Sequence, residues 1–204
     1  MNTSKKGFTL LELVIVIGIL AVLGVVAVLV LNPAQLFAQA RDTTRIEDLG
    51  VLRNALSLYT STVTSPDLDG ATDNCTTLCY IQNSAITGAG CAGPAGAGGG
   101  ARHGAKTATA DADRTVAGAG WVPVDFTGIP GGSPVTTLPI DPSNDATYFY
   151  SYACNNTAKT FELGANMEST RYANGGTDDK EINTKDGGNN DNVYEVGNEP
   201  GLDI

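Results

Sequence analysis

The feature that most constrains this chain is an apolar run near its start. From Phe8 to Leu31 there are 24 residues, of which only Thr9 and Glu12 are clearly polar. As a helix that rises ~1.5 Å per residue, the run reaches about 36 Å, which exceeds the roughly 30 Å of a hydrocarbon core. The sequence therefore predicts a membrane-spanning helix.

The residues before this run set its expected orientation. Residues 1–7 are polar and basic, and they contain Lys5 and Lys6. The positive-inside rule keeps such lysines cytoplasmic and sends the following domain out. A secretory signal peptide is disfavoured, because residues 30–33 lack the small side chains of a cleavage site. A simple signal anchor explains the lysines and the apolar run, but it leaves Glu12 unexplained.

Glu12 is the informative residue of the run. A charged side chain at the bilayer centre costs roughly 2.5–3.5 kcal/mol on the permissive insertion scales, and less near an interface. No lysine or arginine lies between Lys6 and Arg41 to neutralise it within the segment. An acid at this position indicates a function that needs a partner from outside the segment.

The residues around Glu12 resemble a known processing site. The stretch Lys6-Gly7-Phe8-Thr9-Leu10-Leu11-Glu12-Leu13 is similar to that of type IV prepilins and of the pseudopilins of type II secretion. The resemblance implies that a membrane-embedded prepilin peptidase cleaves between Gly7 and Phe8 and then N-methylates Phe8. It further implies self-association into a helical filament, with an inner-membrane platform and an assembly ATPase as partners.

The chemistry of the motif gives Phe8 and Glu12 a role in filament assembly. Cleavage would create an ammonium on Phe8, and an unperturbed α-amino group has a pKa of about 7.7–8.0. This cation can pair with Glu12 of a neighbouring subunit in a low-dielectric helix bundle, where each charge would otherwise be stranded.

The expected protein is therefore a structural subunit and not an enzyme. It would start as a single-pass membrane protein and end in an extracellular pilus or a periplasmic filament. Adhesion, motility, DNA uptake and secretion are the candidate roles. A major-type pseudopilin is the alternative within the family, and a membrane-anchored binding or adhesin domain is the alternative outside it.

The rest of the chain predicts a head on a long helix. Residues 1–7 form the leader and residues 8–31 the membrane and filament-core helix. Asn32-Pro33 should interrupt that helix, because proline removes a backbone donor and disfavours helical geometry before it. Residues 32–62 continue as an amphipathic outer helix, and residues 63–204 form the extracytoplasmic head. The resemblance implies an α+β lollipop, in which the helix packs on a small antiparallel sheet.

The outer helix should have one apolar stripe and one wet face. Apolar residues recur at three- and four-residue steps, as in a helix that packs on one side. The expected stripe consists of Leu36, Phe37, Ala40, Ile46, Leu49, Leu52, Leu56 and Tyr59. The charges between them are interpreted as a solvated face, with pairing between subunits as the alternative: Arg41, Asp42, Arg45, Glu47, Asp48 and Arg53.

Strand patterns appear only in the second half of the head. Residues 148–152 and 160–163 alternate at period two around Asn155-Asn156-Thr157, which predicts a hairpin with its aromatic face packed on the helix. Residues 121–126 and 193–196 are predicted as further short strands. Residues 84–120 are low in complexity and are interpreted as a flexible insert that forms no packed core.

Four cysteines lie beyond the apolar run: Cys75, Cys79, Cys91 and Cys154. An even number in a small exported domain predicts two disulfides, with three possible connectivities. The alternative is a zinc site formed by Cys75, Cys79, Cys91 and His103. The disulfides are favoured, because His103 lies in the Gly/Ala-rich insert.

The formal net charge of −10 and the lack of a Lys/Arg cluster beyond the leader argue against nucleic-acid binding. Residues 178–191 are rich in oxygen ligands, but they do not follow the EF-hand pattern. By resemblance to pseudopilins, the weak calcium candidates are Asp178, Asp179, Asp186 and Asp191. A solvated loop is the favoured interpretation, so no cofactor is expected.

Overall fold

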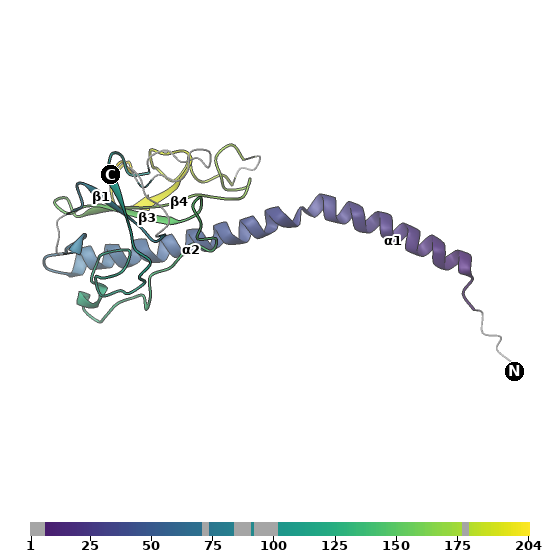
Figure 1. The fold of residues 1–204 in the computed structure, drawn as a ribbon, viewed down its shortest axis with the longest axis horizontal. Coiled ribbons are helices and arrows are strands. Elements are labelled where there is room, and N and C mark those ends of the chain that lie inside the picture. Colours follow the sequence, from purple (N-terminus) through teal and green to yellow (C-terminus); the bar gives the residue numbers. More distant parts are fainter. Residues whose placement is uncertain (1–6, 71–73, 84–90, 92–101, 177–179) are drawn as a thin grey trace. The chain divides into compact units, whose positions relative to one another are not determined.

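The computed structural model describes residues 7–70, 74–83, 91, 102–176 and 180–204. It contains two compact units, Met1–Phe37 and Ala38–Ile204. The first unit holds helix α1 (Leu10–Leu31) and the beginning of α2 (Pro33–Thr62), and the second holds the rest of α2 and the sheet (Figure 1). The elements of the sheet are β1 (Leu78–Ile81), β2 (Thr107–Ala110), β3 (Tyr150–Asn155), β4 (Thr160–Ala165) and β5 (Tyr194–Gly197).

The predicted interruption between the two helices is confirmed at Asn32. This residue adopts a left-handed conformation with φ 39° and ψ 75°. Pro33 is the first residue of α2, a position where the missing backbone N–H breaks no hydrogen bond within the helix. The backbone N–H of Gln35 donates to the carbonyl of Asn32 at 3.0 Å, so Asn32 also caps the start of α2.

The sheet has five strands in the order β2-β1-β3-β4-β5. The predicted hairpin is confirmed, because β3 and β4 pair antiparallel from Tyr150↔Ala165 to Asn155↔Thr160. The predicted last strand is confirmed as β5, which pairs antiparallel with β4. The expectation of a wholly antiparallel sheet is wrong, since β1 and β2 pair parallel. The connection between these two strands is long enough for a parallel return.

The outer part of α2 packs on one face of this sheet, which confirms the α+β prediction (Figure 1). Leu49, Leu52 and Leu56 of α2 are fully buried in one cluster with Tyr150 and Tyr152 of β3. Side chains alternate along a strand, so the aromatic positions of the hairpin all point to the helix. The aromatic row is therefore part of the core, although Tyr148 precedes β3 and is only half-buried.

The apolar stripe was predicted correctly only in its outer half. Leu36 and Phe37 are exposed by 51% and 65%, and Ala40 is exposed as well. The buried positions at this level of α2 are Ala38, Asp42 and Arg45. The prediction fails here because the partner surface is polar, so charged side chains lie where the periodicity places apolar ones.

The buried charges of α2 form a closed network of hydrogen bonds. Arg45 binds both carboxylate oxygens of Asp141, at 2.7 and 2.9 Å, and its Nη1 donates to Asp42 at 2.8 Å. Asp42 also accepts the backbone N–H groups of Glu168 and Ser169, both at 2.8 Å. The interpretation of Asp42 and Arg45 as part of a solvated face is therefore wrong. These charges can be buried because each one is paired and hydrogen-bonded.

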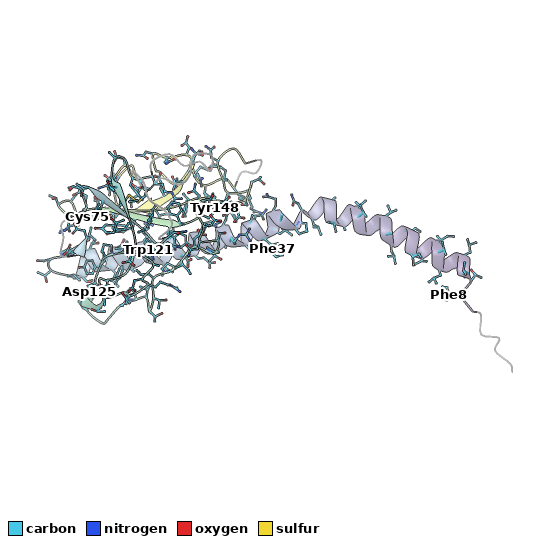
Figure 2. The ribbon with its side chains drawn as sticks, viewed as in Figure 1. Phe8, Phe37, Cys75, Trp121, Asp125 and Tyr148 are labelled. Carbon is cyan, nitrogen blue, oxygen red and sulfur yellow. A yellow bond between two sulfur atoms is a disulfide. The ribbon has the colours of Figure 1, made fainter. Side chains whose placement is uncertain are left out.

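The segment 121–126 is irregular and not the predicted strand. Val122, Val124 and Phe126 are buried at period two, as the strand pattern predicted, but the backbone pairs with no described strand of the sheet. A single bridge joins Ala117 to Asp125, and the 3-10 helix η2 (Phe126–Gly128) follows. The indole N–H of Trp121 donates to the carbonyl of Pro139 at 3.1 Å, which satisfies its polar atom inside the core (Figure 2).

The insert predicted at 84–120 contains ordered structure. Residues 84–90 and 92–101 lie outside the described residues, but β2 falls within the insert, and Cys91, Arg102 and His103 are buried. The interpretation of the whole insert as a surface segment without a packed core is wrong for these residues. They cover the face of the sheet opposite α2, where Ile81 of β1 and Ala153 of β3 are buried with Phe149.

Candidate functional site

The first turn of α1 contains the residues predicted to be processed and assembled. Gly7 and Phe8 precede the helix, and the side chain of Phe8 is 89% exposed (Figure 2). The peptide bond between them therefore lies outside the helix, in backbone without regular secondary structure, which a protease can bind more readily than a helix. The structure places the predicted cleavage position immediately before the helical segment.

Thr9 and Glu12 form a reciprocal cap at the start of α1. The hydroxyl of Thr9 accepts the backbone N–H of Glu12 at 3.2 Å, and the Glu12 carboxylate accepts the backbone N–H of Thr9 at 2.9 Å. The Thr9 hydroxyl also donates to Glu12 Oε2 at 2.8 Å. This is a capping box, which satisfies two backbone donors at a helix start. The carboxylate of Glu12 is thereby directed toward the end of the helix that carries Phe8.

The rest of α1 is apolar on every side. Its large side chains with a described exposure range from 48% exposed at Val16 to 81% at Leu10. In the described part of the chain, one helical region, Leu10–Thr62, contains a stretch long and apolar enough to cross a membrane. A helix that is apolar all round requires a cover of lipid or of other helices. Glu12 is the single acidic residue of α1.

The four cysteines form two disulfides, and the zinc alternative is wrong. Cys75 pairs with Cys154, and Cys79 pairs with Cys91. Thiols that are joined in disulfides cannot serve as thiolate ligands of zinc. Both disulfides hold segments to the sheet: the first joins β3 to the segment before β1, and the second joins β1 to the insert.

The Gly/Ala-rich surroundings of His103 in the sequence suggested an exposed side chain, and the structure shows the opposite. It is fully buried, and its Nε2 lies 2.9 Å from Ser151 Oγ while its Nδ1 lies 3.1 Å from Glu162 Oε1. A Ser-His-Glu relay is known from hydrolases, where the hydroxyl meets a substrate. Here Ser151 and Glu162 are fully buried as well, so no substrate can reach the hydroxyl. No sequence motif indicated this contact, because its members come from three separate segments.

The calcium candidates are divided between described and undescribed residues. Asp178 and Asp179 lie outside the described residues. Asp186 uses its carboxylate to accept the backbone N–H of Gly188 at 2.9 Å and of Glu195 at 2.7 Å, and Asp191 is exposed. Within the described ranges, no group of three or more His, Cys, Asp or Glu residues could hold a metal ion. Calcium binding stays a prediction.

Residues 2–28 match the prokaryotic N-terminal methylation motif. The matched range includes the predicted cleavage position, Glu12 and most of α1. It confirms the resemblance that the residues from Lys6 to Leu13 indicated. No curated protein and no solved structure matches the chain.

Proposed function

Because this chain carries the N-terminal methylation motif of the type IV pilin and pseudopilin family, we propose that it is a filament subunit made as a precursor. In this proposal the peptidase cleaves between Gly7 and Phe8, Phe8 is N-methylated, and α1 moves from the membrane into the core of a type IV pilus. The observation that carries the proposal is a helix that is apolar except for one carboxylate in its first turn and that directly follows a short basic leader.

The position of Glu12 supports a role in joining subunits. Cleavage produces an ammonium at Phe8, four residues before Glu12, and methylation keeps its positive charge. The capping box holds the Glu12 carboxylate at the same end of the helix. When helices stack in a low-dielectric bundle, a shifted neighbour can bring its ammonium to this carboxylate. Pairing at that point selects one stagger between helices, which sets the rise of the filament.

The leader supports the orientation of the precursor. Lys5 and Lys6 would remain on the cytoplasmic side, and the head would lie outside. The two disulfides fit this side of the membrane, because disulfides persist in oxidising compartments.

Intact mass of the membrane-derived protein tests the processing step. The expected protein lacks residues 1–7 and carries one added methyl group at Phe8. A chain that keeps its leader would favour the membrane-anchored binding domain and would contradict the proposal. Gly7→Leu should leave the precursor uncleaved, because a larger residue replaces the glycine before the cut.

Filament yield tests the assembly step. Glu12→Ala and Glu12→Gln should each reduce the filament sheared from cells by more than about tenfold, because the ammonium of Phe8 loses its charged partner. The matched control is Glu47→Ala, which removes an exposed carboxylate from α2. Normal yield from Glu12→Gln would contradict charge pairing. Filaments that stay in the periplasm in the wild type would indicate the pseudopilin alternative.

A further inference from the structure

A second polar cluster lies inside the head, on the face of the sheet opposite α2. Alternation along the strands directs Ser151 of β3, Glu162 of β4 and Glu195 of β5 to this face. In the register, Ser151 and Glu195 both lie opposite Gly164, and Glu162 is two residues from that glycine. Glu162 is therefore the diagonal cross-strand neighbour of both Ser151 and Glu195. His103 covers them from the insert, and all four side chains are fully buried.

Gly164 provides the space for this cluster. A Cβ at this position would lie 3.0 Å from Ser151 Oγ and 3.1 Å from a methyl group of Val193. The side chains of Ser151, Glu162 and Glu195 can therefore come together, because Gly164 of β4 lies between Ser151 and Glu195 and has no side chain.

The hydrogen bonds of the cluster leave one proton to be assigned. Glu162 Oε2 accepts the backbone N–H of Ile204 at 3.2 Å, and Glu195 Oε2 accepts that of Asn190 at 3.0 Å. The remaining oxygens, Glu162 Oε1 and Glu195 Oε1, are buried and form no hydrogen bond with the described residues, although His103 Nδ1 lies 3.1 Å from Glu162 Oε1. Two adjacent carboxylates cannot both be ionised without a large penalty. A proton between them gives each oxygen a partner.

The histidine cannot remove this proton at neutral pH. Burial, helped by the nearby positive charges of Arg102 and Lys106, lowers the pKa of His103 to about 3. Neutral His103 keeps Nδ1 within 3.1 Å of Glu162 Oε1, and in the tautomer protonated at Nδ1 its Nε2 can accept the hydroxyl proton of Ser151. The proton of the carboxyl pair therefore belongs to the two glutamates.

The charges around the pair favour its protonated form. Burial is the largest cause that raises the pKa of Glu162 and of Glu195, each to about 8. Glu199 and Asp203 from the C-terminal segment contribute to the raised pKa of Glu162, and Asp186 contributes to that of Glu195. Two cations act against this: half-buried Lys106 faces Glu162, and buried Arg102 faces Glu195. The ammonium of Lys106 is bound to the backbone carbonyls of Cys75 and Cys154, and the guanidinium of Arg102 donates to the carbonyl of Phe149 and to Asn166.

We propose that Glu162 and Glu195 share a buried proton beside neutral His103, and that this proton makes the stability of the head sensitive to external pH. The head is most stable in mildly acidic surroundings, and it loses stability as the pH rises through neutral to about 8. A surface filament meets the pH of the medium directly, so this cluster would act in the assembled protein as well. The proposal does not depend on how the chain is processed or assembled.

The direction follows from the protons that each state binds. Unfolding returns the glutamates to their ordinary pKa of 4.5 and the histidine to 6.5. The raised pKa of the glutamates stabilises the folded state at low pH, and this contribution is lost as the pH rises toward about 8. The lowered pKa of His103 acts oppositely, but only below 6.5. Between pH 6.5 and about 8, His103 therefore no longer opposes the loss of stability that the glutamates cause.

Unfolding of the full chain in mild detergent and EDTA tests this proposal. Trp121 is the single tryptophan and is buried in the head, so its fluorescence reports unfolding of that unit. The unfolding constant should rise about tenfold per pH unit between 6.5 and 8 if one proton is released. Glu195→Gln should at least halve this slope, because the amide donates permanently to Glu162. Glu47→Gln, on the exposed face of α2, is the matched control and should keep the wild-type slope.

Infrared spectroscopy of the wild-type protein provides a test that needs no folded variant. The carbonyl band of a protonated carboxylic acid should be present at neutral pH and should disappear on the alkaline side. A spectrum at pH 7 without this band would overturn the proposal. The same conclusion follows if Glu195→Gln folds and its pH slope equals that of Glu47→Gln.

Discussion

Helix α1 and the unit Ala38–Ile204, here called the head, differ in how their charged side chains are paired. The helix exposes nearly all of its apolar surface and contains a single carboxylate, whose hydrogen bonds with the described residues all go to Thr9 at the start of the helix. The head buries charged side chains and satisfies them internally, as in the contact of Arg45 with Asp42 and Asp141. The head is therefore complete as a folded unit, whereas α1 needs lipid or neighbouring helices to cover it.

This contrast separates two kinds of failure. A change in the head should act on stability, and a change in α1 should act on insertion, processing or assembly while the head stays folded. Each of the following substitutions is chosen because it tests that separation.

The largest effect is expected from Arg45→Ala. The substitution leaves Asp42 and Asp141 buried without their cation, and breaking a buried pair in this way typically costs about 3–5 kcal/mol. The free energy of unfolding of the head should fall by that amount, measured by denaturant titration with Trp121 fluorescence. Arg53→Ala is the control, since Arg53 is exposed and donates to the carbonyl of Gly197. An equal effect from both variants would contradict the claim that burial makes Arg45 important.

A matched pair of leucines compares the two units directly. Leu52 is fully buried on α2, and Leu20 is 60% exposed on α1. Leu52→Ala should lower the free energy of unfolding of the head by about 2–5 kcal/mol, because it leaves a cavity in the core. Leu20→Ala should leave that free energy unchanged in the same detergent. A head that is destabilised by Leu20→Ala would show that the two units are coupled.

The two disulfides should differ in their contribution to stability. Cys75–Cys154 closes a loop with a sequence separation of 79, and Cys79–Cys91 one with a separation of 12. In the chain-entropy account the longer loop contributes about 1.7 kcal/mol more. Replacing each pair by serine and comparing the unfolding midpoints measures this difference. A larger loss from the short loop would indicate that the second disulfide acts mainly by holding the insert on the sheet.

Local patterns predicted α1 and the hairpin because their signals lie within a few residues. The apolar run, its basic leader and Glu12 are contiguous, and the alternation in β3 and β4 is equally local. The burial of Arg45 could not be predicted in this way, because its partner Asp141 is 96 residues away in the sequence. A charge on a helix has the same local pattern whether it faces water or a buried carboxylate.

The polar cluster of the head shows the same limit. The alternation predicted that Glu162 lies on the face of the hairpin opposite the aromatic row, but such a face is usually wet. It is dry here because Cys91, Arg102 and His103 cover it, and their surroundings are rich in glycine and alanine. Low complexity indicates that a segment contributes little apolar area, and it does not exclude individual anchoring residues. The parallel pairing of β2 was missed for the same reason.

The smallest effect is expected from Thr9→Val, which removes the hydroxyl of the capping box and keeps the shape of the side chain. The backbone N–H of Thr9 can still donate to Glu12, so the carboxylate keeps one of its bonds. The head should unfold as in the wild type, and filament yield should fall far less than in Glu12→Ala. Thr44→Val is the control, because its hydroxyl donates to the carbonyl of Ala40 inside α2. If Thr9→Val abolishes filaments while Thr44→Val does not, the orientation of Glu12 by Thr9 is as important for assembly as the charge of Glu12.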